Sequence, residues 1–200
     1  RLHEAIRDTQ SYLEDYRLNE AANTLYQFTW HEFCDWYIEL IKPALKDPSQ
    51  KEETEQTLLY VLKELLKLLH PIIPFVTEEL WHELPLSSPH MSSPRKRGSS
   101  KESIMNAPYP KFQKKRVNPA AKKEIEILMD TISTIRNIRG EHHVSPSKLI
   151  AANITVKDRK VLTLLEHHKE AIQNLAKLSK LDFGKTVEVS QGVLGTIPQA

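Results

Sequence analysis

The residues of this chain best suited to metal binding or acid–base chemistry are its histidines and its single cysteine. His31 and Cys34 lie three positions apart, so on a helix they would share one face and offer two metal ligands. A structural zinc site needs four such ligands, and no second pair follows at a suitable spacing. The histidines within 141–143 and 167–168 are adjacent and would not face one another. We therefore predict no metal site in this chain.

Motifs for a nucleophile or a phosphate loop are missing from the sequence. It contains no G-x-S-x-G turn and no glycine-rich phosphate loop, and its five glycines are scattered singly. Its acidic residues form no cluster of the kind that general acid–base catalysis uses. The sequence predicts a chain with no catalytic residue and no cofactor of its own.

Basic residues close to aromatic residues indicate binding instead of catalysis. Lys114, Lys115 and Arg116 follow Phe112 in a proline-rich connector, residues 107–117. Proteins bind looped or single-stranded RNA by combining cations for the phosphates with aromatic rings for the bases. The alternative is that these cations are simply solvated, as charged surface residues usually are. Further basic candidates lie near the ends of predicted helices: Arg7, Arg17, Arg136 and Arg139.

Composition limits the kinds of protein this can be. The formal net charge of the 200 residues is only +2, so an RNA site would be a local patch rather than a general basic field. One cysteine supports no disulfide framework and favours a reducing compartment, for which we expect the cytoplasm. No apolar run is long enough to span a membrane. Because the chain opens in helical sequence without a Met, we expect a fragment.

The spacing of apolar residues predicts a mainly α fold. In the stretch 19–42, two adjacent apolar stripes repeat every three or four residues, which is typical of a helix in the middle of a bundle. Asn19 would cap this helix and Pro43 would end it. The aromatic residues of this helix, with one from a later helix, are predicted to be core: Tyr26, Trp30, Phe33, Trp36, Tyr37 and Trp81.

Further helices are predicted on both sides of this one. A helix over 1–16 is separated from it by a very short break at 17–18, so the two would pack antiparallel or meet at a sharp bend. Prolines at 71 and 74 would interrupt the later helical sequence. Three later helices are predicted over 54–69, from the N-cap Thr77 to about 85, and from Asn118 to Gly140.

The sequence pattern changes after residue 145. One strand, one amphipathic helix and two further strands are predicted there, at 149–156, 161–178, 186–190 and 193–197. Before that change, the Ser- and Pro-rich stretch 87–103 carries a basic triplet at 95–97 and is predicted to be a flexible, solvated loop. We expect an antiparallel helical bundle over 1–145 and a small α/β appendage over 146–200.

Four sequence blocks, taken in order, resemble one family. YRLNEAANTLYQFTWHEFCDWYIELIKP is similar to the opening of the anticodon-binding domain of class I aminoacyl-tRNA synthetases, and LLHPIIPFVTEELWHEL is similar to its second signature. SIMNAPYP and ISTIRNIRGEHHVSPSK resemble the third and fourth signatures. Within that family, HEFCDWYIEL is more similar to the valine enzymes than to their isoleucine or leucine relatives. The blocks cover roughly residues 12–150.

The resemblance implies a helical bundle that binds the anticodon stem-loop of valine tRNA as one module of a longer synthetase. The H-I-G-H motif and the nucleotide fold of the family's catalytic domain are absent from this sequence, so ATP would bind to the parent's catalytic domain. Residues 177–180 superficially resemble the family's K-M-S-K-S loop, but they end a predicted amphipathic helix and we interpret the match as coincidence. The expected partners are valine tRNA and the rest of the synthetase chain. We expect a monomer that does not contact a membrane.

Roles for individual residues follow from RNA chemistry. Helix ends expose side chains and unpaired N–H groups, so base contacts are expected at the junction of the first two helices. These candidates are Arg7, Arg17, Leu18, Asn19 and Asn23. Phosphate contacts are expected from Lys114, Lys115, Arg116, Arg136 and Arg139. For Arg136, a salt bridge that closes the bundle is an equal alternative.

Two other functions fit the sequence. The chain could belong to a related synthetase such as the isoleucine enzyme, which would change only the anticodon that is read. It could instead be a helical scaffold that binds proteins through an apolar groove, and it would then show no salt-dependent affinity for RNA. An independent enzyme is the weakest hypothesis, because the sequence offers no catalytic cluster.

Overall fold

The computed structural model describes residues 1–85 and 102–184 and confirms the predicted mainly α fold. Contacts divide the chain into two compact units, 1–117 and 118–200, which we call the first and second units. This division lies earlier than the expected boundary at 145, because the helix after residue 118 packs on helices of the second unit. The strands predicted at 186–190 and 193–197, and most of the loop predicted at 87–103, lie outside the described residues.

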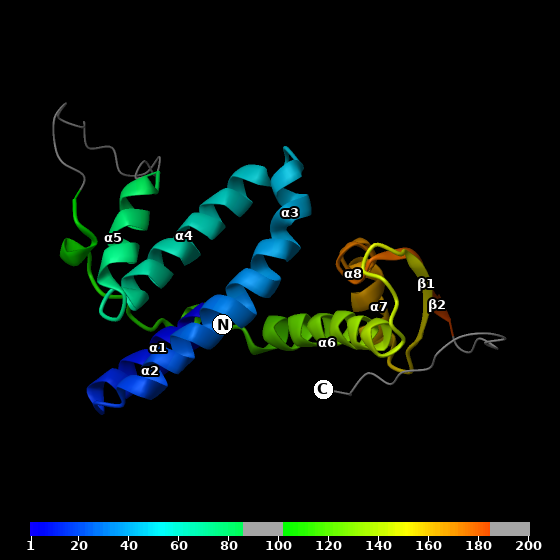
Figure 1. Ribbon diagram of the computed structural model, residues 1–200, viewed down its shortest axis with the longest axis horizontal. Coiled ribbons are helices and arrows are strands. Elements are labelled where there is room, and N and C mark those ends of the chain that lie inside the picture. Colours follow the sequence, from blue (N-terminus) through cyan, green and yellow to red (C-terminus); the bar gives the residue numbers. More distant parts are fainter. Residues whose placement is uncertain (86–101, 185–200) are drawn as a thin grey trace. The chain divides into compact units, whose positions relative to one another are not determined.

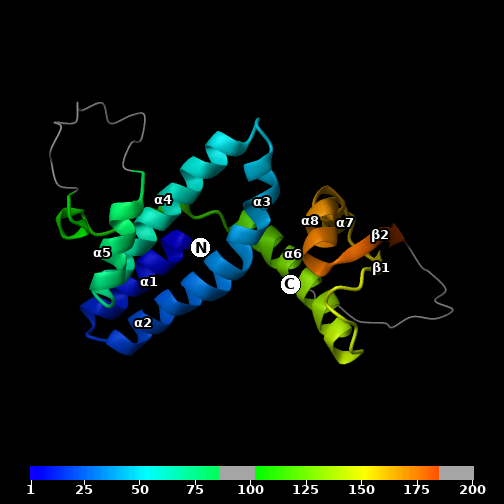
Figure 2. The same ribbon diagram turned by 45° about the horizontal axis from the view of Figure 1, so that its top comes forward.

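The first unit opens with two helices that form an antiparallel pair, as predicted. Helices α1 (Leu2–Glu14) and α2 (Leu18–Gln27) lie side by side in both Figure 1 and Figure 2. The chain reverses between them at Tyr16, which has a φ of 59° in the left-handed region. Such a conformation is uncommon for a residue other than glycine, and here it permits a turn of only three residues.

A π-helical segment, Phe28–Tyr37, continues α2 without a break. The buried positions through this region are Ala21, Leu25, Phe28 and Phe33, which are separated by four, three and then five residues. The step of five matches the backbone hydrogen bonds of a π-helix, which connect residues five apart. The segment therefore presents a different set of side chains to the core than a regular α-helix would.

Two core assignments are wrong, because Leu25 and Phe28 of the neighbouring apolar stripe face the core there. Tyr26 and Trp30, both predicted to be core, are 52% and 53% exposed. Phe33 is buried as predicted, whereas the other three predicted core aromatics, Trp36, Tyr37 and Trp81, are only half-buried. The predicted stripe was drawn at a constant spacing of three and four residues, and the π-helical turn breaks that spacing.

Two predicted helix ends are also wrong. Helix α3 (Ile38–Lys46) contains Pro43 and continues for three residues beyond it, because a proline in the last turn removes only one backbone hydrogen bond. After α4 (Lys51–Leu69), helix α5 (Pro74–Glu83) begins at Pro74 rather than at an N-cap Thr77. Proline suits the first helical position because its missing N–H would have no partner there. Thr77 lies inside α5 and donates its hydroxyl to the carbonyl of Ile73 at 2.9 Å.

The core of the first unit connects α1, α2, the π-helical segment and α4. Its buried members are Leu2, Ala5, Ile6, Leu25, Phe28, Phe33, Leu65 and Leu68. Two residues of the connector, Tyr109 and Phe112, pack against this core although they lie more than 40 residues further along the chain than Leu68. Short 3₁₀ turns at Ile104–Asn106 and Lys114–Arg116 flank this part of the connector. The connector is therefore part of the packed unit.

The second unit begins with α6 (Pro119–Glu141), which starts at the predicted cap. The side chain of Asn118 accepts hydrogen bonds from the N–H groups of Ala120 and Ala121, both at 3.1 Å. Gly140, predicted to end the helix, lies within it, and the left-handed residue after α6 is His143, with a φ of 50°. No helix in the described ranges is long and apolar enough to cross a membrane.

The rest of the second unit is a strand–helix–helix–strand segment. Strand β1 (Ile150–Thr155) confirms the predicted strand and pairs in parallel with β2 (Leu178–Gly184). Helices α7 (Arg159–His167) and α8 (Lys169–Ala176) connect the two strands. The prediction of one helix over 161–178 is therefore wrong in two respects: the helix is divided at His168, and a strand begins at Leu178. The left-handed Lys177, with a φ of 55°, ends α8 and turns the chain into β2.

Candidate nucleic-acid interface

The turn between α1 and α2 exposes the residues predicted to contact bases. Tyr16 is 90% exposed and Leu18 is 63% exposed, and Asn19 and Asn23 also face solvent. Asn19 and Asn23 lie one helical turn apart on α2, so their amide groups share a face. An exposed ring beside amide groups suits an unstacked base, because the ring can stack on the base while an amide hydrogen-bonds to its edge.

Arg17, at the N-cap of α2, is held in place by two neighbours. Its guanidinium carbon lies 4.7 Å from the centre of the Tyr12 ring, and its Nη2 donates to Glu20 at 2.9 Å. This hydrogen bond from Arg17 lowers the pKa of the Glu20 carboxyl, so Glu20 stays ionised. All of these side chains are at the surface, and the ion pair is worth little for stability. Together, the contacts with Tyr12 and Glu20 hold the planar guanidinium of Arg17 in one orientation before a ligand binds.

Arg7 and Arg116 repeat the same arrangement on the connector side of the first unit. Arg7 lies on α1 with its guanidinium 5.8 Å from the Phe112 ring, and its Nε donates to Asp8 at 2.8 Å. Arg116 lies 4.6 Å from the Tyr60 ring of α4, and its Nε donates to the side chain of Gln113 at 3.2 Å. A guanidinium stacked on a ring keeps its edge free for the oxygens of phosphate.

Lys114 and Lys115 complete the connector candidates. Both residues are exposed and belong to the 3₁₀ turn that ends with Arg116. No ion pair within the described part of the chain involves either ammonium group. Consecutive cations on such a tight turn fan out over a small area and repel one another. An anion bound there would relieve that repulsion.

The two remaining phosphate candidates, Arg136 and Arg139, lie in the second unit. Arg136 is exposed and its Nε donates to the carbonyl of Leu175 at 3.0 Å. Arg139 is only 6% exposed. Its guanidinium donates to three carbonyls: that of Lys177 at 3.0 Å, of Ser145 at 2.9 Å and of Lys148 at 2.8 Å. This position does not support the predicted phosphate contact of Arg139, because the group is buried and its N–H groups are already used.

Sequence reasoning brought out the arginines but missed the residues that order them. Tyr12 and Tyr60 each lie under a guanidinium, and Tyr16 is the most exposed aromatic ring of the interface. Tyr12 comes five residues before Arg17, and only the reversal at Tyr16 brings the two together. The available signal was the presence of Tyr12 and Tyr16 in the predicted helix 1–16.

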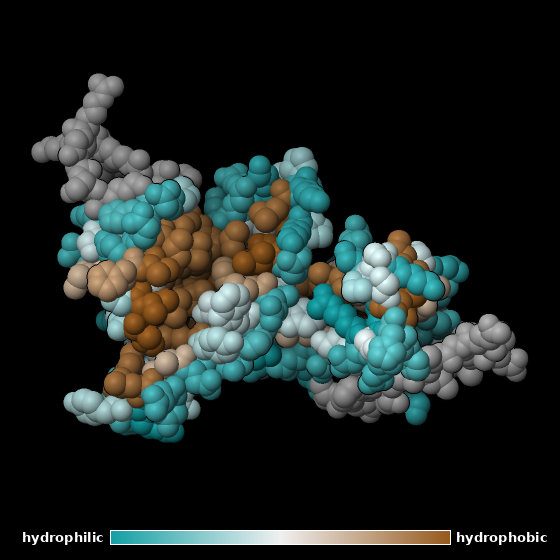
Figure 3. Space-filling model, viewed as in Figure 1, coloured by the Kyte–Doolittle hydropathy of each residue, from teal (hydrophilic) through white to brown (hydrophobic). Residues whose placement is uncertain are grey.

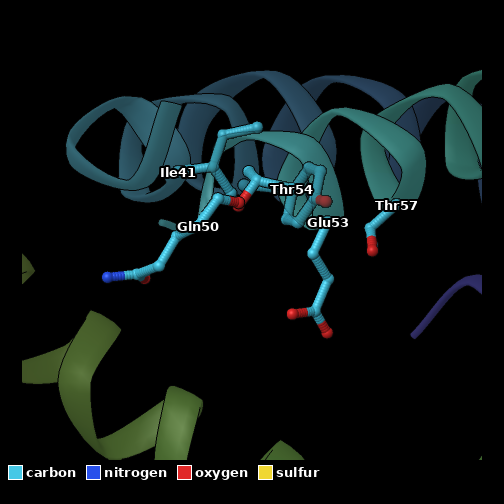
Figure 4. A pocket seen from close by; sticks show the side chains of 6 residues that line it. Ile41, Gln50, Glu53, Thr54 and Thr57 are labelled. Atoms are coloured by element: carbon cyan, nitrogen blue, oxygen red, sulfur yellow. The ribbon is translucent and has the colours of Figure 1, made fainter. Parts of the chain in front are cut away.

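Other potential sites in the first unit offer no cations. A pocket of about 280 Å³ between α3 and the start of α4 is lined by Tyr37, Ile41, Gln50, Glu53, Thr54 and Thr57 (Figure 4). Because the only charged residue of that lining is acidic, the pocket does not suit phosphate. His31 pairs with Asp35 at 3.2 Å rather than with Cys34. Burial raises the pKa of the Cys34 thiol, which favours the unreactive protonated form.

An apolar surface lies over the turn from α4 to α5 and over α5 itself. Its exposed members are Ile72, Ile73, Phe75, Val76 and Leu80, of which Phe75 is 89% exposed. Apolar residues gather on this face of the first unit in Figure 3. Contiguous apolar surface of this kind marks a contact with other protein rather than with RNA.

Comparison with known proteins shows the family of the chain. The family of anticodon-binding domains of tRNA ligases matches residues 1–155, and the chain belongs to that family. The valine–tRNA ligase of Geobacter sulfurreducens is 44% identical over 190 residues, which are 94% of this chain and 20% of that enzyme. The valine–tRNA ligases of Syntrophotalea carbinolica and Thermosynechococcus vestitus are 41% and 38% identical over 94% and 98% of this chain. The chain spans about a fifth of the length of these relatives.

Proposed function

We propose that this chain binds the anticodon stem-loop of valine tRNA as a module of a valine–tRNA ligase. The parent enzyme would attach valine to its tRNA and would consume ATP. This chain would recognise the tRNA and would not contact ATP. Family membership supports binding of an anticodon, and the valine–tRNA ligases among the relatives support the choice of tRNA. The observation that carries the proposal is the set of three stacked guanidiniums, those of Arg7, Arg17 and Arg116.

Two parts of the first unit would make different contacts with the RNA, one mainly with bases and the other with phosphates. At the α1–α2 turn, Tyr16 and Leu18 would stack on loop bases while Asn19 and Asn23 hydrogen-bond to their edges. Arg17 and Arg7 have planar guanidiniums that can donate to a base edge or pair with a phosphate. On the connector, Lys114, Lys115 and Arg116 would neutralise the flanking phosphates, which position the RNA but carry no sequence information.

We infer that the apolar surface of α5 contacts another part of the same synthetase chain. The relatives are about five times longer than this chain, so most of such an enzyme lies outside it. A surface that buries Phe75 and Leu80 within one chain needs no second copy, and we propose a monomer located in the cytoplasm. The alternative of a general protein-binding scaffold draws on the same surface, but it leaves the stacked arginines without a role.

Titration of the chain with two stem-loops tests the proposal. One is the anticodon stem-loop of valine tRNA and the other carries substituted anticodon bases, with both measured at two salt concentrations. We expect tighter binding to the native loop and weaker binding at higher salt, because phosphate contacts release counterions. Equal affinities would contradict anticodon reading by this chain, and a preference for an isoleucine stem-loop would reassign it to the related synthetase. Absence of binding to either RNA would favour the scaffold.

A further inference from the structure

His3 connects the basic connector to the helices of the first unit. The residue is 5% exposed. Its Nδ1 accepts the backbone N–H of Gln113 at 3.3 Å, and its Nε2 lies 3.1 Å from the hydroxyl of Tyr60. The three groups come from α1, the connector and α4, and Gln113 lies 110 residues from His3 along the chain. One imidazole ring thus joins three separate segments.

These contacts determine the protonation state of the ring. A backbone N–H can only donate, so the Nδ1 that faces Gln113 must carry a lone pair. The neutral ring then holds its proton on Nε2, which donates to the Tyr60 hydroxyl. A protonated ring would place an N–H of its own against the N–H of Gln113. The hydrogen bond between the N–H of Gln113 and His3 therefore exists only while His3 is neutral.

The same contacts hold the proposed phosphate-binding cations. Gln113 is the N-cap of the 3₁₀ turn Lys114–Arg116, and its side chain accepts the Nε of Arg116. Arg116 in turn lies over the ring of Tyr60, the other partner of His3. His3, Tyr60, Gln113 and Arg116 thus form a closed set of four residues, which we call the connector latch.

We propose that His3 is a positioning residue for RNA binding, whose neutral ring holds the connector latch and so presents Lys114, Lys115 and Arg116 to phosphate. This inference rests on the function proposed above. It assigns His3 no contact with RNA, because the residue is buried and acts through Gln113 and Tyr60.

The surroundings of His3 set the pH range in which the latch works. Burial lowers its pKa, Arg116 on the connector lowers it further, and Glu64 on α4 opposes them. Tyr60 on α4 also faces the ring. Because the folded pKa lies below the ordinary value of about 6.5, the latch is complete above that pH. Its contribution is lost as the pH falls through the lowered pKa.

Affinity for the valine anticodon stem-loop, measured from pH 7.5 to pH 5 at constant ionic strength, tests the role of His3. The native chain should bind more weakly as the pH falls through the pKa of His3, which burial lowers from its ordinary value. His3→Gln supplies an amide acceptor and donor that do not titrate, so it should bind like the native chain at pH 7.5 and keep that affinity at pH 5. His3→Leu should bind about five-fold more weakly than the native chain at pH 7.5, which corresponds to the loss of one net hydrogen bond, and its affinity should not fall further at pH 5. His142→Gln, at an exposed histidine of the second unit, is the matched control and should retain the acid loss.

A second measurement reports on the latch without RNA. Amide hydrogen exchange at Gln113 should be slow in the native chain and in His3→Gln and faster in His3→Leu. Unchanged exchange in His3→Leu overturns the latch. A native pH profile that matches the profile of His3→Gln overturns the positioning role while leaving the proposed function intact. If the native chain binds no stem-loop at any pH, the proposed function fails, and the role of His3 in RNA binding fails with it.

Discussion

Replacing Arg139 by methionine should strongly destabilise the second unit. The buried guanidinium donates to the carbonyls of Lys177, Ser145 and Lys148 at 2.8 to 3.0 Å. These carbonyls belong to the end of α8 and to the loop between α6 and β1, so one side chain joins three segments. Methionine has a similar apolar stem but no donor. It therefore removes the hydrogen bonds while keeping most of the packing.

The size of the effect follows from the three bonds. A hydrogen bond from a charged donor contributes about 1.5–3 kcal/mol, but the three share one group and are not additive. The residues that carry the carbonyls are exposed, so water replaces part of what is lost. We expect Arg139→Met to cost about 3–5 kcal/mol, the range found when a buried charged network is broken. That is a large share of a total stability of about 5–15 kcal/mol.

Urea unfolding, followed by amide exchange in β1 and β2, measures this cost in the full chain. Arg136→Met is the matched control, because Arg136 is exposed on the same helix and donates to the carbonyl of Leu175. We expect the control to cost about 1 kcal/mol. If Arg139→Met costs no more than Arg136→Met, the structural role given to Arg139 is wrong and its place among the phosphate contacts is open again.

Three further predictions concern single side chains. Tyr16→Ala should lower stem-loop affinity about tenfold through lost stacking, with little change in melting temperature because the ring is 90% exposed; unchanged affinity in a titration would remove Tyr16 from the interface. Asn118→Ala should cost about 1 kcal/mol in urea unfolding because it removes the cap of α6, whereas Asn118→Asp should keep the cap. Cys34 should react with iodoacetamide at pH 8 more slowly than a peptide thiol, because burial raises its pKa; an equal rate would refute this.

The sequence was sufficient for elements whose signals are local. The cap at Asn118, the proline break after α4 and the short reversal between α1 and α2 each depend on a few neighbouring residues. The spacing of the apolar residues was misleading where the backbone changes from an α-helix to a π-helix. Phe28 and Phe33, two successive buried residues of the π-helical segment, are five positions apart. Local residue propensities do not predict that spacing. Phe33 is buried at this spacing, whereas Tyr26 and Trp30, predicted from the same apolar stripe to be core, are exposed.

The interface was predictable only in its chemistry. Arginine and lysine residues suggested RNA, but the ring under Arg17 comes from the preceding helix, α1, and the ring under Arg116 comes from the distant helix α4. Arg139 has the same residue type as the binding candidates, but it is buried and holds the loop after α6 in place. Its burial depends on how that loop folds back, so the residue type alone could not predict it. His3 gave no signal at all, since its main partner, Gln113, lies 110 residues away.

The most direct test of the account measures the salt dependence of binding to the valine anticodon stem-loop, for the native chain and for a variant with Arg7, Arg17 and Arg116 all changed to Gln. Glutamine keeps a polar side chain and removes the charge, and the three side chains are at the surface, so the fold should be retained. The account predicts weaker binding by the variant and a log–log salt slope that is shallower by about 0.7 for each of the three side chains that pairs with a phosphate. An unchanged affinity and slope would contradict the claim that the stacked arginines form the RNA-binding surface.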